Sequence, residues 1–284
     1  MSSSNTNSQF LNNEYNPRAT IPDFAATFSR WQTAASEARA RLQGRLNLPY
    51  GESPAETLDF FPAPQTRSPL LIFLHGGYWR ALDKSDFSWI APPYVAAGVA
   101  VAIVNYALLP STPLAGIVNQ TRRACAWLYR NGARLGLDTR RFLCAGHSAG
   151  GHLTAMMLAT DWPAISADLP RRLLSAGLTI SGLFDLTPLT PAEFLRHDLQ
   201  LNEQQARELS PAFLQCHNDA PLIRAIGALE TAEFHRQSIL MEQHWPHACT
   251  RALIEVPGTH HLSVCDELAR ANGPLWAVVQ STLS

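Results

Sequence analysis

The sequence predicts an α/β fold in which a mainly parallel central sheet is covered by helices on both faces. Continuous apolar runs, typical of strands buried on both faces, recur along the chain. They alternate with segments of helical periodicity, which favours crossover units and hence parallel strands. One of these strands also leads through a glycine-rich turn, residues 146–151, directly into a helix. Together these observations predict a layered α/β domain.

The predicted strands differ in character along the chain. The segment 57–61 alternates apolar and polar residues and is followed by prolines, as an edge strand would be. The later ones are apolar almost throughout, as strands in the middle of a parallel sheet are. In chain order the predicted strands are 57–61, 69–74, 98–106, 141–145, 178–181, 221–226 and 252–256.

Helical spacing of apolar residues predicts five helices, at about 22–46, 114–135, 153–159, 232–245 and 264–279. The polar residues 1–13 are predicted to be a disordered tail, and 14–284 a single domain. A polar, helix-leaning insertion at about 188–220 is a candidate cap over the functional site. For the helix 22–46 two interpretations stay open, namely packing against the domain or covering one rim of that site.

Charge and composition exclude several classes of protein. With 22 Lys and Arg against 23 Asp and Glu, the formal net charge is -1, so no strong field attracts nucleic acid or an anionic membrane. No signal peptide and no membrane-spanning run is recognised, which favours a soluble cytoplasmic protein. Five cysteines without a CxxC pair argue against a disulfide framework and a zinc site. We expect a small-molecule substrate and no cofactor or metal, and a homodimer is one of the assemblies that the sequence allows.

The segment Gly146-His147-Ser148-Ala149-Gly150 matches the G-x-S-x-G pattern of a nucleophile elbow. A serine at a sharp strand-to-helix turn needs small neighbours, and the flanking glycines provide the space. The backbone N–H of Ala149 then lies at a helix N-terminus, which favours a developing negative charge. The alternative is a tight turn of small residues without chemistry. The strand and helix on either side favour Ser148 as a nucleophile.

A second glycine pair, Gly76 and Gly77, follows the predicted strand 69–74. Glycine lets backbone N–H groups approach a ligand closely, so we assign Gly76, Gly77 and Ala149 to an oxyanion hole. The alternative is that the pair only turns the chain.

A serine nucleophile needs a histidine as general base and an acid that orients it. In this architecture the chain order is serine, acid, histidine. The loop after the last predicted strand offers His261, with His260 as the alternative. Glu230, after the strand before it, is the preferred acid, and Asp185, after the strand 178–181, is the competitor.

Four aromatic side chains near these strand ends are candidates for the walls of a substrate pocket. They are Tyr78, Trp79, Tyr106 and Phe184. Packing in the core is the alternative for each of them, because aromatic residues in a domain of this size are often buried.

Four segments together resemble the α/β-hydrolase-type kynurenine formamidases, or arylformamidases, within the hormone-sensitive-lipase-like esterases. They are His75-Gly76-Gly77-Tyr78-Trp79-Arg80, Asn105-Tyr106-Ala107-Leu108-Leu109-Pro110, Gly146-His147-Ser148-Ala149-Gly150-Gly151-His152 and Ser181-Gly182-Leu183-Phe184-Asp185-Leu186. The likeness extends from about Glu14 to the C-terminal helix. This chain has Glu230 where that family commonly carries aspartate.

The resemblance implies an α/β-hydrolase fold and hydrolysis of N-formyl-L-kynurenine to kynurenine and formate through a formyl-serine intermediate, without a metal. Two other functions stay open. One is a general carboxylesterase for short acyl esters, and the other is a non-catalytic binding protein on a hydrolase scaffold.

Overall fold

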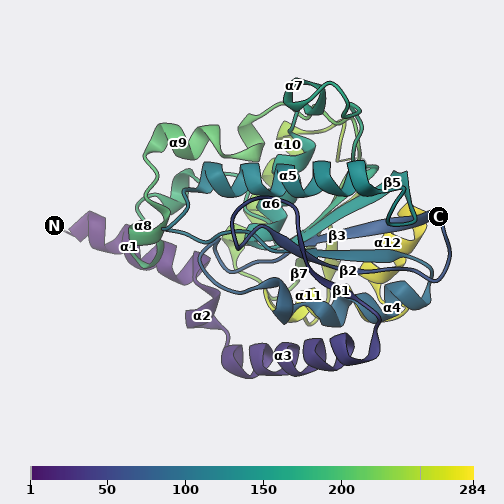
Figure 1. The fold of residues 1–284 in the computed structure, drawn as a ribbon. Coiled ribbons are helices and arrows are strands. Elements are labelled where there is room, and N and C mark those ends of the chain that lie inside the picture. Colours follow the sequence, from purple (N-terminus) through teal and green to yellow (C-terminus); the bar gives the residue numbers. More distant parts are fainter. Residues whose placement is uncertain (1, 250) are drawn as a thin grey trace.

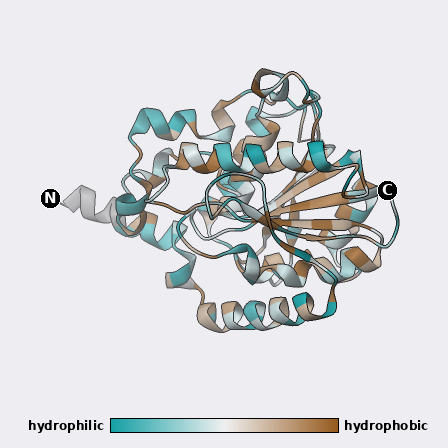
Figure 2. Ribbon diagram, viewed as in Figure 1, coloured by the Kyte–Doolittle hydropathy of each residue, from teal (hydrophilic) through white to brown (hydrophobic). Residues whose placement is uncertain are grey.

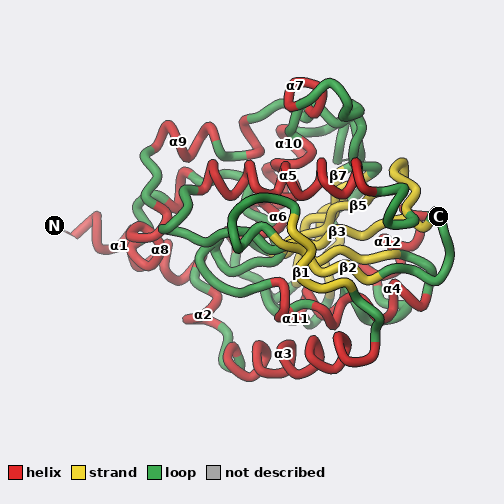
Figure 3. Tube along the Cα trace, viewed as in Figure 1, coloured by secondary structure: helices red, strands yellow, loops and turns green. Residues whose placement is uncertain are grey.

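The computed structural model describes residues 2–249 and 251–284, which form a layered α/β fold around one twisted sheet (Figures 1 and 3). The sheet has eight strands in the order β1-β2-β4-β3-β5-β6-β7-β8. β1 and β2 are antiparallel to their neighbours, and β3 to β8 pair in parallel, as predicted. The strands are β1 (Arg45–Pro49), β2 (Thr57–Phe61), β3 (Ser68–Leu74), β4 (Ala100–Val104), β5 (Leu137–His147), β6 (Ala176–Ile180), β7 (Leu222–Gly227) and β8 (Ile254–Val256).

Helices cover both faces of the sheet (Figure 1). In chain order they are α1 (Ser2–Tyr15), α2 (Pro17–Thr20), α3 (Phe24–Arg41), α4 (Ala91–Ala96), α5 (Leu114–Asn131), α6 (Ala149–Leu158), α7 (Trp162–Ile165), α8 (Glu193–Leu199), α9 (Glu203–Glu208), α10 (Ala232–His244), α11 (Ser263–Asp266) and α12 (Pro274–Leu283). No helix within residues 2–249 or 251–284 combines the length and the apolar character that crossing a membrane requires.

The strands build two hydrophobic cores because successive side chains point to opposite faces of the sheet. In β3, Leu70, Ile72 and Leu74 pack with α5, α6 and α10 on one face. Leu71 and Phe73 pack with α3, α4, α11 and α12 on the other. Figure 2 shows the apolar strands in brown between helices of mixed colour. Burial on both faces explains why the central strands read as continuous apolar runs in the sequence.

The structure describes a helix where the sequence predicts an N-terminal tail. Residues 2–13, predicted as disordered, belong to helix α1, whereas residue 1 lies outside the described residues. The helix is attached at its C-terminal end, where Leu11 and Tyr15 are buried. The composition of this segment is predominantly polar, so it does not reveal that these two side chains are buried.

Two predicted helices have different bounds in the structure. The one expected at 22–46 is α3, which ends at Arg41, and the chain then enters the edge strand β1. β1 is short and largely exposed, and the helix predicted to run to residue 46 took in the start of its Arg45-Leu46-Asn47-Leu48 alternation, so the strand was missed. The helix expected at 264–279 is split into α11 and α12, because Gly273-Pro274 starts a new helix with proline in its first turn.

The insertion expected at 188–220 contains the short helices α8 and α9. α8 contacts α1, and both lie at the same end of the molecule (Figure 1). This is the end at which β5 passes into α6. The insertion and the N-terminal helices therefore lie around the predicted site.

Candidate active site

Ser148 lies at the turn between β5 and α6, in the strained backbone conformation that an elbow requires. Its φ is 57° and its ψ is -117°, and its N–H donates to the Ile180 carbonyl of β6 at 2.8 Å. A Cβ at Gly146 would lie 2.0 Å from the Gly150 carbonyl oxygen, and one at Gly150 would lie 1.9 Å from that of Leu74. Only glycine fits at either position, so the motif has a steric cause.

The structure brings Ser148, His261 and Glu230 into one hydrogen-bonded chain. His261 Nε2 lies 3.0 Å from Ser148 Oγ, and His261 Nδ1 lies 2.6 Å from Glu230 Oε2. A carboxylate only accepts hydrogen bonds, so Nδ1 carries the proton and Nε2 is free to accept the serine proton. Each residue comes from a loop at the carboxyl end of a strand, namely β5, β7 and β8.

Glu230 is ionised although its side chain has no exposed surface. Burial acts to raise the pKa of Glu230. The charge of His261 and the hydrogen bond that His261 donates act in the opposite direction and hold the pKa below its usual range. The Ser181 hydroxyl and the Gly227 N–H also donate to Oε1, the latter at 2.8 Å. Both carboxylate oxygens are therefore satisfied, and the acid has one fixed orientation.

His147 holds the loop that carries the general base, His261. Burial, and then the charge of His261, lower the pKa of His147 to about 3, so its ring is neutral. Its Nε2–H donates to the His261 carbonyl oxygen at 2.6 Å. No signal in the sequence predicted this contact between His147 and the histidine loop, because the two segments meet only in the folded chain.

The alternatives for the acid and the base lie in other contacts. Asp185 accepts from the N–H and the hydroxyl of Thr187 at 2.9 and 2.7 Å, as the first residue of a turn would. His260 Nδ1 accepts from the Leu262 and Ser263 N–H groups. Both side chains serve local turns, and neither contacts Ser148.

The three residues assigned to the oxyanion hole lie around Ser148. A Cβ at Gly76 would be 3.3 Å from the Ser148 Cβ and 2.9 Å from the His147 carbonyl oxygen, so this loop packs directly on the elbow. Gly77 has a φ of +100° and lines the cavity described below. Within the part of the chain that the structure describes, the N–H groups of Gly76, Gly77 and Ala149 donate to no backbone acceptor. They are free to bind a developing oxyanion.

Tyr106, which is buried in the core, holds this glycine loop in position. Its ring stacks on His75 with centroids 4.2 Å apart, and its hydroxyl donates to the His75 carbonyl oxygen at 2.6 Å. His75 Nδ1 in turn donates to the Gly76 carbonyl at 2.9 Å. These contacts fix where the N–H groups of the loop point.

A cavity of about 1010 Å³ opens over Ser148 and His261, within the size range of small-molecule sites. Its walls are formed by the N-terminal segment 16–32, the loop 77–82 and residues of α8. Of the four predicted wall residues only Tyr78 lines it. Trp79, Tyr106 and Phe184 are fully or almost fully buried in the core, so that part of the prediction is wrong. Their apolar surface is used in packing, as the alternative interpretation had it.

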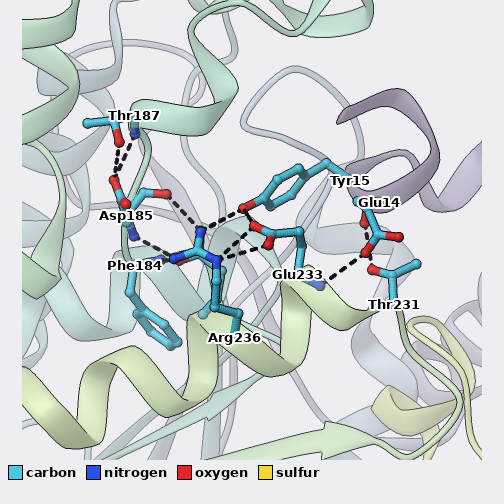
Figure 4. Close-up of polar contacts among 9 residues, drawn as sticks. Glu14, Tyr15, Phe184, Asp185, Thr187, Thr231, Glu233 and Arg236 are labelled. Carbon is cyan, nitrogen blue, oxygen red and sulfur yellow. Dashed lines mark hydrogen bonds and ion pairs between the residues drawn. The ribbon is translucent and has the colours of Figure 1, made fainter. Parts of the chain in front are cut away.

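The N-terminal segment is attached to the start of helix α10, as Figure 4 shows. The Tyr15 hydroxyl donates to Glu233 at 2.5 Å, and the Thr231 hydroxyl donates to the Glu14 carbonyl at 2.6 Å. The Tyr78 hydroxyl donates to the Tyr15 carbonyl. Helix α10, which follows Glu230, thus holds the wall of the cavity in place. For the helix 22–46 both open interpretations apply, because α3 packs through Trp31 and also lines the cavity.

Sequence reasoning missed several residues of the cavity. Arg18, Arg80, Phe194 and Asp198 all line it. Arg80 directly follows the motif Gly76-Gly77-Tyr78-Trp79, and this place in the sequence could have indicated that it lies near the site. The others come from segments that approach the site only in the folded chain. Among the described residues no group of three His, Cys, Asp or Glu side chains is placed to hold a metal ion.

The sheet, the elbow and the Ser–His–Glu chain define a serine hydrolase of the α/β-hydrolase fold. The chain is 30% identical over 274 residues to the kynurenine formamidase of Salmo salar, covering 92% of this chain and 89% of that one. The kynurenine formamidase of Danio rerio is 31% identical over 274 residues, with 93% and 90% covered. The chain therefore belongs to the kynurenine formamidase family.

Other comparisons agree with the fold. A family model described as BD-FAE matches residues 58–175. A crystal structure from Silicibacter sp. TM1040, provisionally described as a thioesterase, has a TM-score of 0.85 at 32% identity, covering 95% of this chain and 98% of that one. The carboxylesterase EstE1, from a metagenomic library, has a TM-score of 0.72 at 17% identity, covering 92% and 96%, and shows the fold alone.

Proposed function

We propose that this protein hydrolyses N-formyl-L-kynurenine to L-kynurenine and formate, with Ser148 as nucleophile, His261 as general base and Glu230 as the acid that orients it. The observation that carries this proposal is the hydrogen-bonded chain Ser148–His261–Glu230 at the floor of the cavity. Family membership supports the formamide as the substrate. The aromatic walls of the cavity, which include Phe24, Phe28 and Tyr78, fit an aryl group.

Acylation follows from this geometry. Ser148 Oγ attacks the formyl carbon while His261 Nε2 takes its proton, and the Glu230 carboxylate stabilises the imidazolium that forms. The negative charge on the formyl oxygen is bound by the free N–H groups of Gly76, Gly77 and Ala149. His261 then donates its proton to the aryl nitrogen as the C–N bond breaks. L-kynurenine leaves as the neutral arylamine, and the formyl group stays on Ser148.

Deacylation repeats these steps with water. His261, neutral again, takes a proton from a water molecule that attacks the formyl carbon. The second tetrahedral intermediate collapses when His261 returns a proton to Ser148 Oγ, which releases formic acid, ionised to formate at neutral pH. Hydrogen bonds hold Glu230 and His147 in place, so the imidazole keeps its orientation in both half-reactions.

A short-acyl carboxylesterase is the second candidate, because the same groups hydrolyse esters. It is favoured by partial matches to esterases, such as 31% identity over 103 residues to a Mycobacterium tuberculosis carboxylesterase. The test is kcat/KM for N-formyl-L-kynurenine against p-nitrophenyl acetate. We expect the formamide to be preferred, and an ester preference of orders of magnitude would assign the protein to the esterases. Labelling of Ser148 by an organophosphonate checks the nucleophile in either case.

The location and partners of the protein belong to the same proposal. We infer a cytoplasmic enzyme that acts on a small molecule, which is supported by five cysteines that are all free. Cell fractionation checks the location, and recovery in a membrane or secreted fraction would contradict it.

A further inference from the structure

One wall of the cavity carries two opposite charges. Arg80, on the loop after Gly77, forms an ion pair with Asp198 of α8, and both side chains line the cavity over Ser148. We propose that this pair is the subsite for the α-amino-acid group of the substrate, with Asp198 binding the ammonium and Arg80 the carboxylate. This inference rests on the proposed function, since the leaving group of N-formyl-L-kynurenine ends in an amino acid.

Both members of the pair keep unused hydrogen-bonding capacity. Arg80 donates through Nη1 to Asp198 Oδ2 and, at 2.7 Å, to the Phe194 carbonyl. Its Nε and Nη2 donate to no acceptor among residues 2–249 and 251–284. In the described part of the chain, Asp198 Oδ1 has only the exposed His197 nearby, with 3.5 Å between Oδ1 and Nδ1. A guanidinium accepts a carboxylate through two parallel N–H donors, and a free carboxylate oxygen accepts an ammonium.

Stability alone does not account for the pair. The side chains of Arg80 and Asp198 are 32% and 24% exposed, and ion pairs open to solvent contribute little to folding. The rest of the lining is largely apolar around the aromatic side chains, so these two charges provide local polar recognition within the cavity. Arg18 also lines the cavity, but it is exposed and its guanidinium lies over the Phe24 ring, 5.2 Å from the centroid.

Charge complementarity identifies the ligand class. A zwitterion brings one positive and one negative group, and the pair offers one partner of each sign at one place. The ammonium and the carboxylate of the amino acid would insert between Arg80 and Asp198 or bind to their free atoms. In either case each charge that leaves water gains a partner of opposite sign. Simple formanilides and short esters lack both groups. The subsite would therefore separate an amino-acid arylformamide from these smaller substrates.

The test compares wild type and variants on three arylformamides. These are N-formyl-L-kynurenine, its deaminated analogue 4-(2-formamidophenyl)-4-oxobutanoate, and its methyl ester, in which the carboxylate is masked. For the wild-type enzyme, loss of either charge should lower kcat/KM about tenfold or more, as loss of a charged hydrogen bond does. In Asp198→Asn the penalty for removing the ammonium should largely disappear. In Arg80→Gln the penalty for masking the carboxylate should disappear.

These ratios distinguish recognition from support of the fold. A merely structural pair predicts that both variants lower kcat/KM for all three compounds by the same factor, which would overturn the proposal. Asp168→Asn is the matched control, because it breaks the exposed Arg130–Asp168 ion pair away from the cavity and should leave every ratio as in wild type. Equal wild-type rates for the three compounds would overturn the subsite but leave the formamidase function intact. Activity toward esters with none toward any arylformamide would instead refute the proposed function.

Discussion

The Glu230 side chain has no contact with solvent, so hydrogen bonds from His261, Ser181 and Gly227 stabilise its charge. A buried carboxylate with all its partners keeps the imidazole in the tautomer that can accept the serine proton. Removing the charge leaves the geometry but changes the tautomer that is favoured. A conservative substitution of Glu230 is therefore a sharp test of the proposed mechanism.

For Glu230→Gln we expect kcat to fall by a factor on the order of 10⁴, the loss known for a triad whose histidine is held in the wrong tautomer. Initial rates with N-formyl-L-kynurenine measure this effect. Asp185→Asn is the matched control, since the Asp185 carboxylate accepts hydrogen bonds from Thr187 and is not part of the Ser148–His261–Glu230 chain. We expect its kcat to stay within a few-fold of wild type. The reverse ranking of the two variants would show that the acid is misassigned.

At the scale of elements, the N-terminal segment and helix α10 act together. Tyr15 donates to Glu233 and accepts from Gln237 Nε2 at 3.1 Å, and Gln237 Oε1 accepts from the N–H groups of Phe184 and Asp185, each at 2.8 Å. Figure 4 shows these contacts converging between α1 and α10. The segment that follows Tyr15 forms the cavity wall, so its attachment determines the shape of the pocket.

Tyr15→Phe should lower the free energy of unfolding by about 1 to 3 kcal/mol, because it removes the hydrogen bonds that the buried Tyr15 hydroxyl makes with Glu233 and Gln237. It should also raise KM more than it lowers kcat, since the wall loosens while the triad stays intact. Urea unfolding and steady-state kinetics measure the two effects. Tyr129→Phe is the control, because the Tyr129 hydroxyl bonds to none of the described residues. Equal stability of the two variants would contradict the role given to Tyr15.

The elbow is an element whose shape requires glycine. Gly150→Ala should destabilise the fold by about 3 kcal/mol or more, because the new Cβ would meet the Leu74 carbonyl oxygen at 1.9 Å and neither backbone can move freely. Gly136→Ala gives the comparison: φ is +76° there, but nothing lies within 4 Å of the added Cβ, so only backbone strain of about 1 kcal/mol is expected. Thermal or urea unfolding of both variants checks the difference, and a smaller loss for Gly150→Ala would contradict the steric argument.

At the scale of the whole molecule, buried neutral histidines make stability depend on pH. Burial lowers the pKa of His152 to about 4, and burial followed by the charge of His261 lowers that of His147 to about 3. In the unfolded chain both would titrate near 6.5. Below that pH the unfolded chain binds protons that the folded protein does not, so stability is lost as pH falls from about 6.5 toward the folded values.

The free energy of unfolding should therefore fall between pH 6.5 and 5, each histidine contributing about 1 kcal/mol per pH unit. His152→Gln keeps a donor for the Leu209 carbonyl, which His152 Nε2 contacts at 2.8 Å, and should reduce this slope by about that amount. Urea titrations at several pH values decide, and an unchanged slope in His152→Gln would refute the assignment.

The sequence predicts those parts of the molecule whose cause is local. The elbow follows from the steric needs of Gly146 and Gly150, and the central strands from burial on both faces. The edge strand β1 was missed because its alternation is only about four residues long and its start was assigned to the preceding helix. Helix α1 was not expected, because the burial of Leu11 and Tyr15 arises only in the folded chain. The same limit applies to the cavity. Arg18 and Asp198 line the same cavity as Ser148 only because the N-terminal segment and the insertion are brought to it by the fold. Trp79 and Phe184, which lie next to predicted site residues in the sequence, are instead buried in the core.

The central claim is that Ser148 carries the formyl group of N-formyl-L-kynurenine during turnover. The direct measurement is rapid mixing of enzyme and substrate, acid quenching before the first turnover is complete, and mass spectrometry of the digested protein. The account predicts that the peptide containing Ser148 gains the mass of one carbonyl group, and that Ser148→Ala neither gains it nor releases kynurenine at a comparable rate. Kynurenine release by Ser148→Ala at the wild-type rate, or a formyl group on another residue, would contradict it.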